Sequence, residues 1–166
     1  MKANYFNTEA DARWAIFFEE LGIPYLYENK FIIISNGSAI LPSFYLPNFH
    51  EGTYGIVKSF FDDESIEECY LLFEKTKKTV VFLEGMPDYK CQKVIHDLGQ
   101  SHPIYSTAIF CADQAQYNNG FFWNPGYEDK DLTISSEYFD CLGESFTDAV
   151  YKAKSYQIKT IYIPIK

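Results

Sequence analysis

Cysteine and histidine have the most versatile chemistry in this sequence, but their spacing does not predict a metal centre. The four cysteines form no Cys-x-x-Cys pair, and the three histidines lie near none of them in the spacing of zinc ligands. We therefore expect the cysteines to be thiols of the core. The sequence also lacks the Gly-x-Ser-x-Gly, Walker, Gly-x-Gly-x-x-Gly and His-x-x-x-His motifs. The cysteines are Cys69, Cys91, Cys111 and Cys141.

Residues 117–127 combine turn-forming residues with five aromatic side chains. Tyrosine and tryptophan are favoured anchors of protein interfaces, so this segment is a candidate binding loop. The alternative interpretation is a loop that folds back to cover the core. The next four residues are mainly acidic, which makes single-stranded nucleic acid a poor ligand for it. The candidate binding residues are Phe121, Phe122, Trp123 and Tyr127.

The charge of the chain argues against direct binding to nucleic acid. It has 14 basic and 23 acidic residues, and Arg13 is its one arginine. Because lysine and arginine supply the phosphate contacts of nucleic-acid-binding proteins, this balance predicts a poor surface for DNA or RNA. The excess acid either keeps an aromatic-rich protein in solution or attracts a basic protein partner.

The length of 166 residues predicts a single domain without a membrane-spanning segment. Its apolar runs, such as residues 31–34, are much shorter than the roughly 20 residues that cross a bilayer. The first eight residues contain no apolar stretch typical of a secretory signal, so we expect a cytoplasmic protein.

The first half of the chain shows clear signals for secondary structure. Thr8 and Asp11 form a capping-box pattern that predicts a helix over residues 8–21, ended by Gly22. The pair Asn36-Gly37 predicts a hairpin turn between strands. The expected strands are 25–28, 30–35, 39–46, 54–60 and the fully buried 79–83, with a second helix over 63–78.

The second half is less regular. Periodicity predicts a short helix over 89–98, strands over 104–111 and 132–138, and a helix over 144–156. Residues 160–165 are expected to form an edge strand, because Pro164 cannot donate to a ladder.

Three of these segments, in this order, resemble small phage and mobile-element proteins related to the PD-(D/E)xK nucleases. They are Thr8–Glu28, the motif Pro42-Ser-Phe-Tyr-Leu-Pro47 and the motif Tyr54-Gly-Ile-Val-Lys58; Glu144–Lys154 is faintly similar to the group's final helix. The resemblance implies an α/β (α+β) fold with a mixed central sheet, flanking helices and a restriction-endonuclease-like core. That core would span residues 1–85, and residues 86–166 would be a C-terminal extension packed on it.

The resemblance also implies a magnesium site, from which this sequence departs. Such enzymes hold Mg²⁺ with an Asp of the second motif, a Glu of the third and often a Glu of the first helix. Here the Asp and Glu positions are Ser43 and Ile56, and only Glu9 and Lys58 remain. Hard cations need oxygen ligands, so we expect a vestigial site that holds no cofactor.

Two alternatives remain for the carboxylates. One of Glu51, Glu64, Glu67 and Glu68 could take over a ligand role, or the three on the second helix simply form its solvated face. Glu9 lies four residues before Arg13, the spacing of a helical ion pair.

The leading hypothesis is a non-catalytic protein of a phage or mobile element that binds a basic protein partner. Such a protein could inhibit a nucleic-acid-handling or defence complex of the host. The alternative is a Mg²⁺-dependent DNA nuclease with rearranged ligands, and a third hypothesis is a virion assembly protein that associates with itself. The sequence leaves the oligomeric state open.

Overall fold

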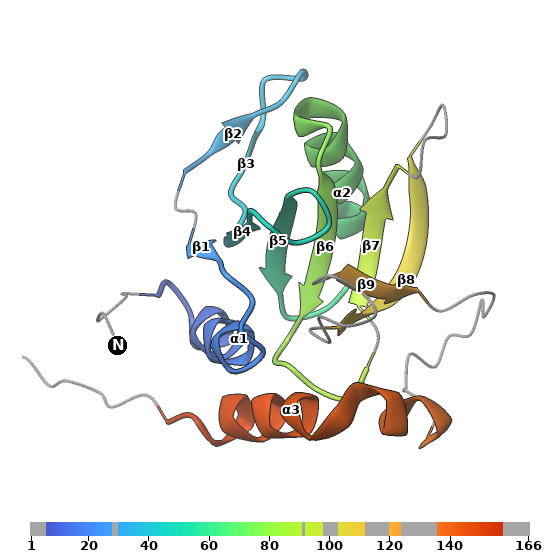
Figure 1. The fold of residues 1–166 in the computed structure, drawn as a ribbon. Coiled ribbons are helices and arrows are strands. Elements are labelled where there is room, and N and C mark those ends of the chain that lie inside the picture. The colour runs from blue at the N-terminus through green and yellow to red at the C-terminus, as the bar shows by residue number, and fades with distance from the viewer. Residues whose placement is uncertain are drawn as a thin grey trace, which may run out of the picture.

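The computed structural model describes residues 6–27, 30–90, 92–97, 103–111, 120–123 and 136–157. Within these residues the chain has a mixed α+β fold with one seven-stranded sheet, a separate two-stranded sheet and three helices. Among the described residues, no helix is both long and apolar enough to cross a membrane. The expected mixed central sheet with flanking helices is therefore confirmed (Figure 1).

Helix α1 (Glu9–Glu20) begins as its sequence predicts. The Thr8 side chain accepts a hydrogen bond from the Asp11 backbone N–H at 3.1 Å, and the Asp11 carboxylate accepts one from the Thr8 backbone N–H at 3.2 Å. Two unpaired donors of the first turn are thereby satisfied. The helix stops at Gly22, whose φ of +67° is accessible to glycine at little cost.

The large sheet has the strand order β1-β4-β5-β6-β7-β8-β9. Only β5 (Thr53–Lys58) and β6 (Thr79–Glu84) pair in parallel, with helix α2 (Asp63–Thr76) as the crossover between them. The first five residues of β6 are all buried, as expected for a central strand covered on both faces. The other strands are β1 (Leu26–Tyr27), β4 (Phe44–Leu46), β7 (Gln92–His96), β8 (Ile104–Cys111) and β9 (Gly120–Trp123).

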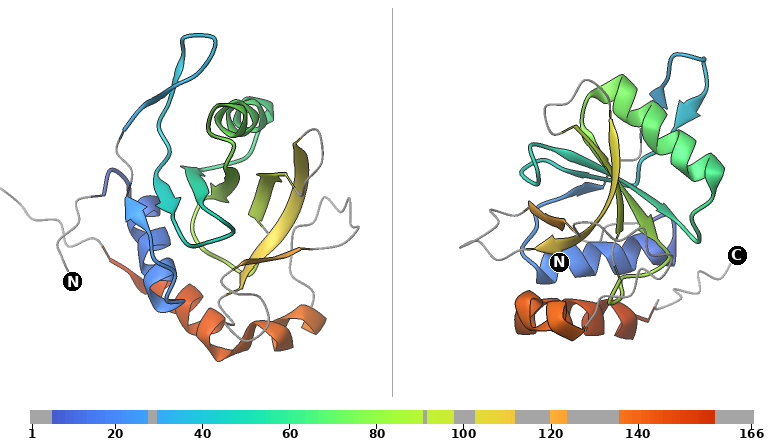
Figure 2. Two further views of the ribbon diagram at one scale, coloured as in Figure 1. Left: turned by 45° about the horizontal axis from the view of Figure 1, so that its top comes forward. Right: turned by 90° about the vertical axis from the view of Figure 1, so that its right-hand side faces the viewer.

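The two faces of the sheet carry different helices. Helices α1 and α3 (Ser136–Ser155) cover one face, and α2 covers the other (Figures 1 and 2). On the α1 side an aromatic core forms, in which the Phe17 ring lies 5.5 Å from that of Phe146 in α3 and 6.0 Å from that of Phe110 in β8. Strands and a helix from the second half of the chain thus complete the sheet and core begun by the first half.

Four expectations need correction. The single strand expected over 39–46 is split into β3 (Ala39–Ile40) and β4, since Pro42 lies between them and cannot donate to a ladder. Strand β3 pairs with β2 (Ile32–Ile33) in the two-stranded sheet, whereas β4 joins the large sheet.

The prediction of a helix over 89–98 is wrong, because residues 92–96 form β7 between β6 and β8. Helix α3 begins at Ser136, eight residues earlier than expected, so residues 136–138 of the expected strand 132–138 are helical. Residues 120–123 of the expected binding loop form strand β9. The strand expected over 160–165 lies outside the described residues.

Candidate functional site

Ser43 and Ile56, the two positions at which the resemblance implies metal ligands, lie side by side. The Ser43 backbone N–H donates to the Gly55 carbonyl at 2.9 Å, and the register that pairs Phe44 with Gly55 continues to place Ser43 beside Ile56. Side chains alternate along β5, so Lys58 lies on the same face as Ile56. The strand pairing therefore brings Ser43, Ile56 and Lys58 together below α2.

Ile56 belongs to the apolar core of this face. Its side chain is only 3% exposed and packs in a cluster with Cys69, Leu72 and Phe73 of α2. A branched hydrocarbon side chain has no atom that can bind a cation. The position that carries a glutamate in the nuclease motif is used here for packing between sheet and helix.

Lys58 is paired with a carboxylate from α2. Its ammonium group forms an ion pair with Glu68, and the two side chains are 36% and 29% exposed. Glu68 is thus the one carboxylate of the second helix that reaches the motif lysine, while Glu64 and Glu67 are exposed on the helix surface. Glu51 precedes β5 and so lies at the opposite end of that strand from Lys58.

Glu9 and Lys58 do not share a site, which corrects their grouping as one vestigial centre. Glu9 lies on α1, on the other face of the sheet, and forms the expected ion pair with Arg13. Arg13 also donates to the Ala153 carbonyl of α3 at 2.9 Å. This pair therefore connects the two helices and has no contact with the motif lysine.

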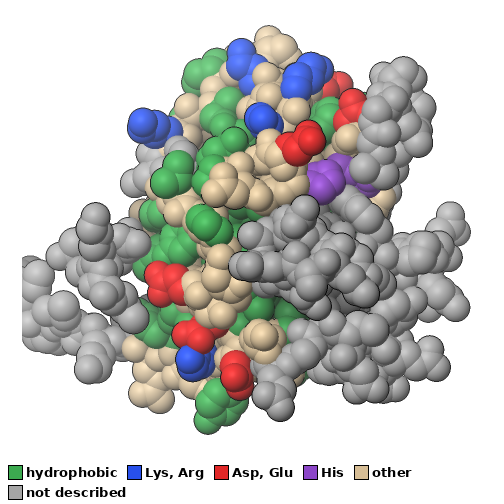
Figure 3. Space-filling model, in the orientation of Figure 1, with side chains coloured by type: hydrophobic (Ala, Val, Ile, Leu, Met, Phe, Trp, Pro, Cys, Tyr) green, Lys and Arg blue, Asp and Glu red, His purple; other side chains and the backbone are tan. Residues whose placement is uncertain are grey.

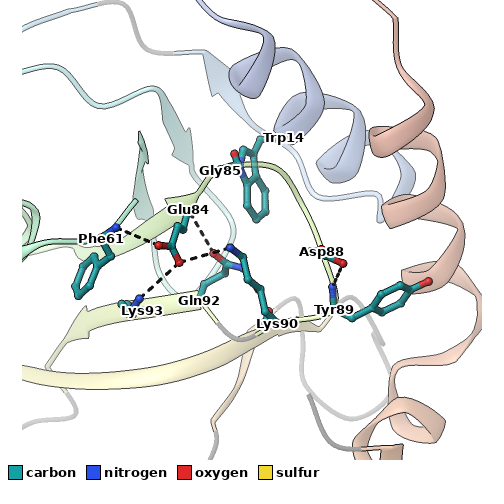
Figure 4. Close-up of polar contacts among 9 residues, drawn as sticks. All are labelled: Trp14, Phe61, Glu84, Gly85, Asp88, Tyr89, Lys90, Gln92 and Lys93. Carbon is teal, nitrogen blue, oxygen red and sulfur yellow. Dashed lines mark hydrogen bonds and ion pairs between the residues drawn. The ribbon is translucent and has the colours of Figure 1, made fainter. Parts of the chain in front are cut away.

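Glu84 organises a second group of charges at the end of β6, next to Lys58 in the β5–β6 register. One of its carboxylate oxygens accepts a hydrogen bond from the Phe61 backbone N–H at 3.1 Å. The other lies 3.5 Å from the Lys90 ammonium and 3.7 Å from that of Lys93 (Figure 4). One carboxylate thus serves two ammonium groups.

Lys93 is held between a carboxylate and an aromatic ring. Its ammonium group lies 4.1 Å from the centroid of the Phe61 ring, a cation–π geometry. Burial lowers the pKa of Lys93. The positive charge of Lys90 lowers this pKa further, whereas the negative charge of Glu84 partly opposes the change. These five residues, Lys58, Glu68, Glu84, Lys90 and Lys93, are called the lysine–glutamate cluster below.

The chemistry of this cluster is that of ion pairing. Glu68 faces the ammonium group of Lys58, and Glu84 faces those of Lys90 and Lys93. Within the described part of the chain, no three His, Cys, Asp or Glu side chains gather in a way that could hold a metal ion.

The expected aromatic binding residues are only partly placed. Phe121, Phe122 and Trp123 belong to β9, which pairs with β8 at one end of the strand order. They therefore lie on a strand and not on the expected loop. Tyr127 lies outside the described residues.

Sequence reasoning missed a pair of histidines at the other end of the central strands. The His50 Nδ1 lies 3.0 Å from the Thr79 Oγ1, and the His96 Nε2 lies 2.9 Å from the Ser106 Oγ. The two rings are 6.5 Å apart, and burial lowers the pKa of both. They are 46 positions apart in the chain, so no local motif could have revealed them.

Comparison with family models, with curated proteins and with solved structures finds no match for this chain.

Proposed function

We propose that this chain is a non-catalytic binding protein that uses a nuclease-like scaffold to engage a basic protein partner. The observation that carries the proposal is the burial of Ile56 in the apolar core. The position that would need a metal-binding carboxylate is instead a buried side chain of the core below α2. The neighbouring Lys58 is neutralised by Glu68, so the motif lysine has a structural partner.

The first half of α2 is the surface best suited to a basic partner. Its exposed acidic residues are preceded by Phe60, a strongly exposed aromatic side chain. Aromatic anchors within a charged rim are common in protein interfaces, and complementary charge speeds association. A surface of this kind can compete with nucleic acid for a basic groove, which suits an inhibitor of a nucleic-acid-handling complex. The acidic residues are Asp62, Asp63, Glu64 and Glu67.

The test uses a labelled synthetic peptide rich in arginine, lysine and leucine as the probe. Fluorescence anisotropy should show binding at low salt that weakens as salt is raised. The double variant Glu64→Lys/Glu67→Lys should lose about tenfold or more in affinity. Glu74→Lys is the control for the single variant Glu67→Lys, which makes the same charge change, because Glu74 is exposed on the same helix outside this surface. No binding, or an equal loss in Glu67→Lys and Glu74→Lys, would contradict the proposal.

A second candidate, a Mg²⁺-dependent nuclease with rearranged ligands, is favoured by one contact. Glu68 reaches Lys58 from α2, which is where a displaced catalytic carboxylate would have to enter. Calorimetry with Mg²⁺ and Mn²⁺, followed by cleavage of supercoiled plasmid, distinguishes the two. Metal-dependent nicking that Glu68→Gln abolishes would establish the nuclease, whereas no heat of binding and no nicking would support the binding protein.

A further inference from the structure

The two-stranded sheet of β2 and β3 has one buried and one exposed apolar face. On the inner face Ile34 and Ile40 are buried and pack with the core below α2. On the outer face Phe31 is 67% exposed and Ile33 is 58% exposed. Ile33 pairs with the exposed Ala39 of the other strand. The hairpin projects from the body of the molecule (Figures 1 and 2), so this face is open to a large partner.

The hairpin face differs in charge from the rest of the chain. Residues 29–50 contain none of the 23 acidic residues, and Lys30 is their one lysine or arginine. Figure 3 shows hydrophobic side chains along the side of the molecule that carries β1 to β4. Leu26 of β1, the strand that precedes the hairpin in the chain, is also exposed. The patch is thus apolar and almost uncharged in a chain of net charge −9.

We infer that the outer face of the β2–β3 hairpin, formed by Phe31, Ile33 and Ala39, is a contact surface between two copies of this chain. Two molecules of charge −9 repel each other, and this repulsion is weakest where neither presents acid. A basic partner gains nothing from such a patch. A two-fold contact needs a self-complementary surface, which an apolar ribbon provides.

The size of the patch predicts a weak association. The three side chains of one hairpin can bury much less surface area than the roughly 800 Å² that each partner buries in a standard interface. A dissociation constant of about 1 μM to 1 mM is the range for contacts of this size. Salt screens the repulsion between the two acidic molecules, so the self-association should strengthen as salt is raised. Binding of a basic peptide should instead weaken as salt is raised. Because the two salt dependences are opposite, a failure of this inference can be distinguished from a failure of the proposed function.

The test is sedimentation equilibrium of the full chain over a range of concentrations at low and moderate salt. We expect the mean mass of the wild type to rise from monomer towards dimer as concentration increases. The double variant Phe31→Ser/Ile33→Thr should remain a monomer over the same range. Tyr151→Ser is the matched control, since Tyr151 is equally exposed but lies on α3, and it should associate like the wild type.

A second variant separates loss of contact from loss of folding. Ala39→Glu places one acid on the same face of each copy, so it should abolish the dimer at low salt and recover part of it at high salt. Circular dichroism checks that each variant is folded. A wild type that stays monomeric, or a dimer that none of these variants weakens, would overturn the inference. Binding of the wild type to phosphatidylcholine vesicles without self-association would also overturn it and assign the face to lipid.

Discussion

Lys58 of β5 forms an ion pair with Glu68 of α2, directly beside the position where Ile56 enters the core below that helix. The pair joins the end of β5 to the helix that covers this face of the sheet. Because both side chains are partly exposed, water screens their attraction. The ion pair therefore balances the charge of Lys58 but contributes little to the free energy of unfolding.

We therefore expect Lys58→Met and Glu68→Gln each to lower the free energy of unfolding by about 1 kcal/mol or less. Urea denaturation of the two single variants and the double variant gives the coupling energy of the pair. A coupling of more than about 2 kcal/mol would show that the pair is desolvated and holds the sheet to the helix.

Ile56→Glu introduces the residue type that the resemblance implies at this position and should damage the fold. The new carboxylate would be buried among apolar side chains, so we expect a loss of about 3 kcal/mol or more in the free energy of unfolding at neutral pH. Ile56→Val is the control and should cost about 0.5–1.5 kcal/mol. Thermal unfolding with and without Mg²⁺ is the decisive measurement. A selective rise in the melting temperature of Ile56→Glu with Mg²⁺ would show that the site can still accept a cation.

Much of the fold could be predicted because its signals are local. The caps of α1, the acidic start of α2 and the continuous apolar run of β6 each lie within one segment. The motif spacing also anticipated that Ser43 and Lys58 would lie near Ile56, since register follows from neighbouring strands.

The failures concern contacts between distant segments. Residues 92–96 are a strand because β6 and β8 pair with them on both sides, and their own apolar spacing could not reveal these partners. The separation of Glu9 from Lys58 could not be predicted either, because the face that α1 covers is set by the aromatic core it shares with α3. Likewise, only the completed sheet brings His50 and His96 together.

The partly buried His50 and the buried His96 should make the stability depend on pH. Burial lowers the pKa of each below its ordinary value of 6.5. Glu51 partly opposes this change for His50, whereas His50 lowers the pKa of His96 further and Asp97 partly opposes it. The folded state therefore binds fewer protons than the unfolded state as pH falls through about 6.5. The stabilising effect of the neutral rings is fully present above that pH and is lost progressively below it.

Thermal unfolding between about pH 7.5 and about pH 5 tests this dependence, at up to about 1.4 kcal/mol per pH unit for each proton. The variants His50→Gln and His96→Gln should each flatten the curve, and the double variant should flatten it most. Carboxylates that titrate in the same range act on all of these proteins alike, so the difference between them isolates the histidines. Parallel curves would contradict the assignment.

Cys69 should be unreactive in the native protein. Burial raises the pKa of its thiol to about 12, with a smaller contribution from the neighbouring Glu68, so almost no thiolate forms at neutral pH. Alkylation with iodoacetamide followed by peptide mass analysis should label Cys69 slowly in buffer and rapidly in denaturant. Rapid native labelling of the Cys69 peptide would mean that α2 opens from the sheet far more often than its packing predicts.

Trp14 connects the aromatic core on the α1 face with the lysine–glutamate cluster at the carboxyl end of β6. Its indole is almost fully buried, and the Nε1 donates to the Gly85 carbonyl at 2.9 Å, one residue beyond Glu84 (Figure 4). Trp14→Ala should lower the free energy of unfolding by about 3–5 kcal/mol. Trp14→Phe keeps an aromatic ring but removes the donor, so about 1–3 kcal/mol should be lost. Urea denaturation measures both, and equal losses would show that ring packing contributes little beyond the hydrogen bond. A smaller loss in Trp14→Phe is expected because most of the stabilisation comes from apolar area that phenylalanine retains.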